Sequence, residues 1–267
     1  MQATAYAEIN ELLDSLLAQI HHVLDQQLVG VYLYGSLVWG DFDPESSDID
    51  LVVATASGID DQEFNDLNQM QLAFIETHKR WQGRIEIAYV LVDALRTFKS
   101  HNSMIAVISP GEPFHFKETD QGWLMNWYMV QEQGRILFGP APSSLIDPIS
   151  KHEFIRTVRQ HAERWGEWVY DSHDRPSQAY AILTLCRALY TCTHGVQVSK
   201  RKAAEWAAQQ LPEWAPLINS ALQWRVNWRD DDVNHEATFP ETVRFVQFMR
   251  ARIEAINTTR ITPQQNT

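Results

Sequence analysis

The chain alternates between helix-spaced and continuous hydrophobic patterns over its first half. Apolar residues at three- and four-residue spacing over residues 6–28 predict an amphipathic helix. Five apolar runs predict strands, over residues 30–35, 49–54, 84–92, 105–108 and 135–138. Helical spacing returns over 60–79, and Asp120 is placed to cap a helix that ends at Gly134. The first half is therefore predicted to be an α/β domain.

The second half carries only helical patterns. The stretch 139–144 is rich in proline, serine and glycine, which is typical of a boundary. Helices are predicted beyond it over residues 150–170, 177–194, 199–210, 213–228 and 238–257. We therefore expect an α/β domain over 1–145 and a helical bundle over 146–267.

Composition limits where the protein acts. No segment of the 267 residues has the length and hydropathy of a membrane span, and the first residues do not resemble a signal peptide. The two cysteines, Cys186 and Cys192, lie in one predicted helix, where six residues rise about 9 Å, too far for a disulfide. Reduced cysteines favour the cytoplasm.

Charge narrows the choice of partner. Acidic residues outnumber basic ones by 34 to 22, which gives a net charge of −12. Nucleic-acid binding needs a basic surface, and the one basic cluster is 200–202. An acidic surface attracts a small cationic molecule instead, although ordinary solubility explains the same charge.

Two short motifs carry the chemistry. The run Gly35-Ser36-Leu37-Val38-Trp39-Gly40 follows a predicted strand, and Ser47-Asp48-Ile49-Asp50-Leu51 begins the next. Gly35 allows close backbone approach, and Ser36 offers a hydroxyl and an N–H to a phosphate oxygen, with Ser47 assisting. Residues two apart on a strand share a face, so Asp48 and Asp50 present two carboxylates suited to Mg²⁺. A turn-rich hairpin whose aspartates cap loops is the alternative. The order of the motifs favours phosphoryl or nucleotidyl transfer.

With these motifs the sequence resembles the nucleotidyltransferase superfamily that includes DNA polymerase β, in its small-molecule, antibiotic-modifying branch. The resemblance implies a mixed sheet with a third carboxylate on a later strand. Glu86, within the apolar run 84–92, supplies that carboxylate as the expected catalytic base. A glutamate on an edge strand that faces water is the alternative.

The second half is similar to the C-terminal domain of the adenylyltransferases that modify streptomycin and spectinomycin. This similarity rests on Ala181-Ile182-Leu183-Thr184-Leu185-Cys186-Arg187, on Gly195-Val196-Gln197-Val198-Ser199-Lys200 and on Ala203-Ala204-Glu205-Trp206. It implies that Arg187 and Lys200 reach the phosphates of ATP, the co-substrate. The family's acidic substrate contact would fall near Ser177, whereas this chain has Asp171 and Asp174 earlier.

The resemblance implies a Mg²⁺-dependent adenylyltransferase, expected to be a monomer, that transfers AMP from ATP to a hydroxyl of an aminoglycoside-like antibiotic. One or two Mg²⁺ ions on Asp48 and Asp50 complete the expected site. Two alternatives stay open from the sequence. One is an antitoxin-type nucleotidyltransferase that acts on a protein or a tRNA. The other is a catalytically degenerate module that only binds a nucleotide.

Overall fold

The chain divides into two compact units, each described by itself. The computed structural model describes residues 2–45, 47–226 and 234–256. One unit comprises residues 1–42 and 47–149, and the other comprises 43–46 and 150–267. The main division thus falls between Ile149 and Ser150, where Ser150 forms a capping box with Glu153 and begins a helix.

The first unit is built on a six-stranded mixed sheet. Its strands are β1 (Leu28–Tyr34), β2 (Ile49–Thr55), β3 (Ile85–Leu91), β4 (Met104–Ile108), β5 (His115–Glu118) and β6 (Arg135–Phe138). They lie in the order β5-β4-β3-β2-β1-β6. Only β2 and β3 are parallel, because helix α3 (Asp61–Thr77) connects them, and the other neighbours are antiparallel.

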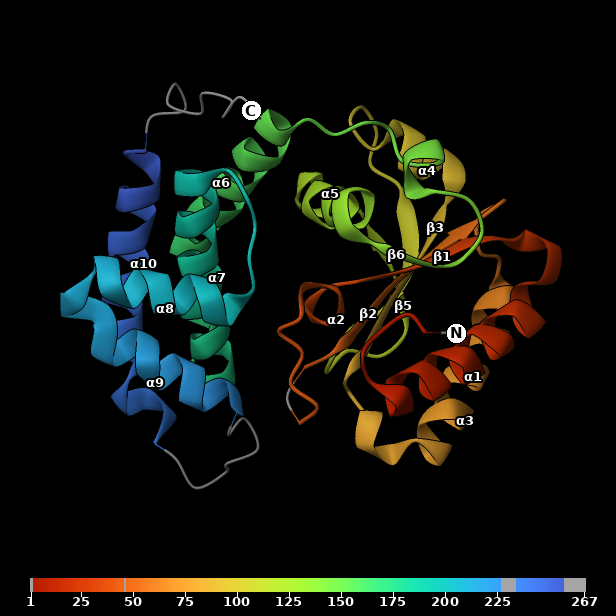
Figure 1. The fold of residues 1–267 in the computed structure, drawn as a ribbon, viewed down its shortest axis with the longest axis horizontal. Coiled ribbons are helices and arrows are strands. Elements are labelled where there is room, and N and C mark those ends of the chain that lie inside the picture. Colours follow the sequence, from red (N-terminus) through yellow and green to blue (C-terminus); the bar gives the residue numbers. More distant parts are fainter. Residues whose placement is uncertain (1, 46, 227–233, 257–267) are drawn as a thin grey trace. The chain divides into compact units, whose positions relative to one another are not determined.

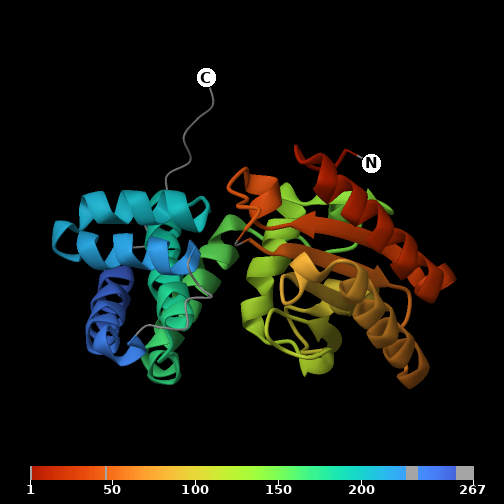
Figure 2. The same cartoon turned by 90° about the horizontal axis from the view of Figure 1, so that it is seen from below.

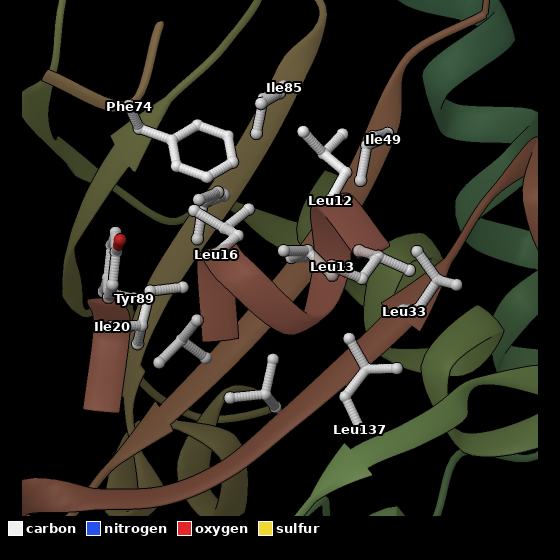
Figure 3. Packing of buried hydrophobic residues seen from close by; sticks show 14 of the residues in the cluster. Leu12, Leu13, Leu16, Ile20, Leu33, Ile49, Phe74, Ile85, Tyr89 and Leu137 are labelled. Atoms are coloured by element: carbon white, nitrogen blue, oxygen red, sulfur yellow. The ribbon is translucent and has the colours of Figure 1, made fainter. Parts of the chain in front are cut away.

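Helices cover both faces of the sheet (Figure 1). On one face, α1 (Ala7–Leu24) and α3 pack against strand residues whose side chains alternate along β1, β2 and β3. Figure 3 shows Leu12, Leu16 and Ile20 of α1 in this core with Leu33 of β1 and Ile49 of β2. The opposite face is approached by α5 (Leu124–Gln133), which contacts β1. Two short helices complete the unit, α2 (Ser36–Trp39) and α4 (Val92–Thr97).

The strand alternation decides which way the candidate site faces. The side chains of Leu33, Leu51 and Ile87 belong to the core under α1 and α3. Residues one position away, including Asp50 and Glu86, therefore point to the opposite face.

The second unit is a helical bundle (Figure 2), made of α6 (Lys151–Trp168), α7 (Arg175–His194), α8 (Lys200–Gln210), α9 (Ala215–Val226) and α10 (Phe239–Glu254). Helix α7 is central and contacts each of the other four. Buried residues lie on most sides of α7, in agreement with its long apolar sequence. Both cysteines lie buried on α7 as free thiols, as expected. None of the helices within the described residues is long and apolar enough to cross a membrane.

The predicted elements are confirmed with shifts at their ends and three omissions. Helix α1 ends at Leu24, before the predicted end at residue 28. Strand β1 begins at Leu28, two residues before the predicted start at residue 30. The short helices α2 and α4 and strand β5 were missed. Strand β5 has only half-buried or exposed residues, which leave no apolar signal. Asp120 caps a 3₁₀ turn, and the α-helix begins at Leu124. The predicted helix 213–228 is α9, and residues 227 and 228 lie outside the described residues.

Candidate active site

Three residues lie in a row across the middle of the sheet. Tyr34 at the end of β1 pairs with Asp50 of β2, and Asp50 pairs with Glu86 of β3. Residues paired across neighbouring strands point to the same face, so their side chains lie next to one another. Tyr34 is 4% exposed, and both carboxylates are half-buried. The register thus brings together two acidic residues that are 36 positions apart in the sequence.

A hydrogen bond joins the outer members of this row. The Tyr34 hydroxyl donates to Oε1 of Glu86 at 3.3 Å. Strand β3 lies between β2 and β4, so Glu86 is not on an edge strand, and the alternative of a water-facing edge glutamate is wrong.

Gly35 forms the turn that follows β1. Its φ of 75° is a conformation that side chains other than glycine rarely adopt. A Cβ atom there would lie 1.9 Å from Oδ2 of Asp50. The sequence predicted a close approach of Gly35 to phosphate, and the close approach seen in the structure is to the Asp50 carboxylate. Ser36, which is half-buried, begins α2 directly after this turn.

The segment before β2 is fastened to β3. Arg84, 2% exposed, donates from Nε at 3.1 Å and from Nη2 at 2.5 Å to the carbonyl oxygen of Ser47. The Arg84 guanidinium also lies 4.6 Å from the centre of the Trp81 ring. The N–H of Ile49 donates to the carbonyl oxygen of Arg84 at 2.9 Å. These contacts fix the backbone on both sides of Asp48, which lies half-buried just before β2.

Ser47 differs from its expected role. Its side chain is 1% exposed, so the hydroxyl is not presented to a ligand in this conformation. Ser47 contributes its carbonyl oxygen to the Arg84 contact instead, and Ser36 is left as the serine suited to phosphate.

We expect Arg84→Met to lower the free energy of unfolding by about 2–3 kcal/mol and to reduce turnover. The change leaves the buried Ser47 carbonyl without these two donors and loosens the segment that carries Asp48. Arg80→Met is the matched control, because the exposed Arg80 makes a surface ion pair with Glu8 at 3.4 Å that is worth less than about 1 kcal/mol. Urea denaturation of both variants measures the difference. Equal losses of stability in the two variants would contradict the role of Arg84.

The predicted phosphate-binding residues Arg187 and Lys200 belong to the second unit. Arg187 is half-buried on α7, and Lys200 is the first residue of α8, whose N-cap is Ser199. Nζ of Lys200 lies 3.9 Å from the centre of the Tyr180 ring on α7, a cation–π contact. The other predicted site residues that stay close together, Gly35, Ser36, Asp48, Asp50 and Glu86, all lie in the first unit.

The acidic residues near the start of α7 have separate positions. Asp174 is the N-cap of α7 and accepts hydrogen bonds from the N–H and the hydroxyl of Ser177 at 2.8 and 2.6 Å. Asp171 is exposed in the turn that precedes it. The carboxylate of Asp174 therefore stabilises a helix start.

Two residues of the site were missed by the sequence reasoning. Tyr34 directly precedes Gly35, and a hydroxyl at the end of a buried strand was the available signal. Arg84 directly precedes the apolar strand β3 and is buried. A buried charge needs a partner, but the sequence does not identify which residue that is.

The carboxylates at the start of the central strand β2 suit a hard cation. Asp48 and Asp50 offer carboxylate oxygens, and Mg²⁺ usually takes one or two of these and completes its shell with water and phosphate. Within the ranges that the structure describes, no three His, Cys, Asp or Glu side chains form a ready-made metal cluster.

The mixed sheet, with the Gly35 turn against Asp50 and with Glu86 beside it, is the arrangement expected of a nucleotidyltransferase. Residues 17–109 match the family model of the nucleotidyltransferase domain. Residues 144–252 match that of the C-terminal domain of aminoglycoside adenylyltransferases. The chain belongs to the aminoglycoside adenylyltransferase family and is an adenylyltransferase enzyme.

Relatives match over nearly the whole chain. An aminoglycoside (3'') (9) adenylyltransferase of Escherichia coli is 25% identical over 276 residues, covering 96% of this chain and 99% of that protein. One from Rhizobium radiobacter is also 25% identical and covers 92% and 93%. The crystal structure of a spectinomycin adenyltransferase from Enterococcus faecialis, solved with ATP and spectinomycin, has a TM-score of 0.74 at 18% identity. It covers 92% of this chain and 99% of that one, and shows that the fold is shared.

Proposed function

We propose that the enzyme transfers AMP from ATP to a hydroxyl of an aminoglycoside or spectinomycin-like antibiotic and releases pyrophosphate. The observation that carries this proposal is the register of Asp50 beside Glu86, directly against the Gly35 turn. The names of the full-length relatives support the class of acceptor. We expect the enzyme to act as a monomer, with no nucleic acid or membrane as its partner.

Glu86 acts as the general base in this proposal. Its carboxylate takes the proton from the acceptor hydroxyl, and the oxygen then forms a bond to the α-phosphorus of ATP. The bond from that phosphorus to the bridging oxygen breaks, and pyrophosphate leaves with the electron pair. A strand position paired with Asp50 of β2 suits this role, because the carboxylate is held in place before the substrate arrives.

Asp48 and Asp50 would hold one or two Mg²⁺ ions, whose charge would stabilise the α-phosphate and the leaving pyrophosphate. Gly35 and Ser36 would approach the β- and γ-phosphates, and a separate role in binding the phosphates of ATP is proposed for Arg187 and Lys200 of the second unit. A forked contact is expected from Arg187 and a point charge from Lys200.

An acceptor screen tests this proposal. The purified enzyme is incubated with ATP, Mg²⁺ and each of a panel of aminoglycosides and spectinomycin, and pyrophosphate release is followed. We expect release that depends on at least one antibiotic acceptor. Release with tRNA or a protein acceptor alone would favour the antitoxin-type alternative, which the net charge of −12 disfavours for RNA.

We expect Lys200→Ala to raise the KM for ATP about ten- to a hundredfold and to leave the KM for the acceptor nearly unchanged. A charge-assisted contact to phosphate contributes about 1.5–3 kcal/mol to binding. Lys202→Ala is the matched control, because Lys202 lies on the same helix, carries the same charge and is exposed. Steady-state kinetics with each substrate varied measures the difference. If Lys200→Ala changes both KM values equally or neither, Lys200 does not bind the nucleotide.

A further inference from the structure

We infer that Tyr180 is a positioning residue for Lys200, and this inference rests on the proposed role of Lys200 in binding the phosphates of ATP. Tyr180 lies on α7, and Lys200 is the first residue of α8. Nζ of Lys200 lies 3.9 Å from the centre of the Tyr180 ring, well within the separation of about 6 Å at which an aromatic ring attracts a cation. The contact therefore joins the two helices at the residue that is proposed to meet the nucleotide.

An aromatic ring holds an ammonium group in a way that suits a phosphate ligand. The face of the ring attracts the ammonium but carries no net charge, so the positive charge of Lys200 is not cancelled by this contact. The ammonium has three donors, and those that point away from the ring can meet phosphate oxygens. A lysine side chain loses rotamer freedom when it binds a ligand, and holding it in advance reduces that loss.

The start of α8 explains why such a contact is useful to Lys200. Its first turn begins with Lys200, Arg201 and Lys202 and has no acidic residue. Positive charges at a helix N-terminus oppose the helix dipole, whereas an anion in the same place is stabilising. The Tyr180 ring offsets part of the cost for Lys200 without supplying an anion. The positive end of the helix therefore remains available to a phosphate group.

The Tyr180 ring is itself supported by the bundle. Its side chain is 50% exposed, and its ring centre lies 5.8 Å from that of the buried Trp165 on α6. Tyr180 and Arg187 are seven residues apart on α7, close to two helical turns, so they lie on the same side of that helix. The ring thus places the Lys200 ammonium on the side of α7 that carries Arg187, the other residue proposed to bind the phosphates.

A purely structural contact would behave differently. A tyrosine between two helices covers apolar surface, and its loss would lower stability without changing the affinity for ATP. A positioning role requires that Tyr180 act on ATP through Lys200. Its effect on affinity should then vanish once the Lys200 side chain is removed.

The test is a pair of variants, Tyr180→Leu and Tyr180→Phe, each made alone and together with Lys200→Ala. Binding of ATP with Mg²⁺ is measured by calorimetry without an acceptor, and urea denaturation checks that each variant is folded. We expect Tyr180→Leu to raise the Kd for ATP about three- to tenfold, the effect of losing a cation–π contact. Tyr180→Phe keeps the ring and should bind ATP as the wild type does. Combined with Lys200→Ala, Tyr180→Leu should change the Kd no further.

Tyr190→Leu is the matched control. Tyr190 lies on the same helix, and its ring centre lies 5.2 Å from that of Trp206 on α8, so this variant also loses an aromatic contact between α7 and α8. We expect it to lose stability and to keep the wild-type Kd for ATP. The inference is overturned if Tyr180→Leu and Tyr190→Leu change the Kd equally, if Tyr180→Phe binds as weakly as Tyr180→Leu, or if the effect of Tyr180→Leu persists without Lys200.

The design separates this inference from the proposed function. If the wild type transfers AMP to no antibiotic acceptor, the proposed function fails, and calorimetry without an acceptor still decides whether Tyr180 acts through Lys200. If the wild type is active and Lys200→Ala binds ATP weakly but Tyr180→Leu binds it normally, only the role of Tyr180 is lost. If Lys200→Ala also binds ATP normally, the role of Tyr180 is overturned together with that of Lys200.

Discussion

Replacing Asp50 with asparagine should abolish AMP transfer while the protein stays folded, and Asp48→Asn should do the same. An amide keeps the shape of the side chain but removes the charge with which each carboxylate would hold Mg²⁺. Without that charge the phosphates of the transition state are not neutralised. Because the substitution is nearly isosteric, the free energy of unfolding should change by less than about 1 kcal/mol. Pyrophosphate release at saturating Mg²⁺ and urea denaturation measure the two effects.

The matched control is Asp66→Asn on the exposed surface of α3, where the same chemical change should leave turnover intact. A variant of Asp48 or Asp50 that keeps more than a few per cent of wild-type turnover at saturating Mg²⁺ would refute the metal assignment for that residue.

Glu86→Gln should lower turnover about 10²–10⁴-fold while Mg²⁺–ATP and the acceptor bind nearly as in the wild type. Glutamine keeps one acceptor oxygen, so the Tyr34 hydroxyl still has a partner, but the amide cannot take a proton from the acceptor. The acidic limb of the pH–rate profile should disappear with the carboxyl group. Calorimetry with ATP and Mg²⁺ and single-turnover kinetics separate binding from chemistry.

The register of Glu86 beside Asp50 also allows another outcome, because a carboxylate in that position can bind a metal. If Glu86→Gln loses affinity for the nucleotide and regains activity at high Mg²⁺, Glu86 is a third metal ligand and not the base.

The sequence was sufficient to predict the elements that carry the chemistry. Continuous apolar runs identified β1, β2 and β3, and the carboxylates stood at the start of two of them. Gly35 was singled out as a point of close backbone approach, and its positive φ is available to glycine at little cost, while its contact with phosphate stays a prediction. The close contact between Gly35 and the Asp50 carboxylate was not predictable, because it arises only once β1 and β2 pair.

The contacts that support the site could not be predicted, since they depend on strand register. Tyr34 and Glu86 are 52 residues apart, and only the order β3-β2-β1 brings them into one row. Arg84 and the Ser47 carbonyl are 37 residues apart, and a buried backbone acceptor carries no signature in the sequence. Strand β5 was missed for a related reason, because an exposed strand has no hydrophobic alternation to detect.

Mass spectrometry of the acceptor tests the central claim most directly. The wild type and Glu86→Gln are incubated in parallel with ATP, Mg²⁺ and the acceptor that supports the fastest pyrophosphate release. We expect the wild type to convert the acceptor to a product heavier by one adenylyl group, with one pyrophosphate released for each product, and Glu86→Gln to yield almost none in the same time. An acceptor whose mass is unchanged while ATP is consumed would contradict AMP transfer to a hydroxyl of that molecule.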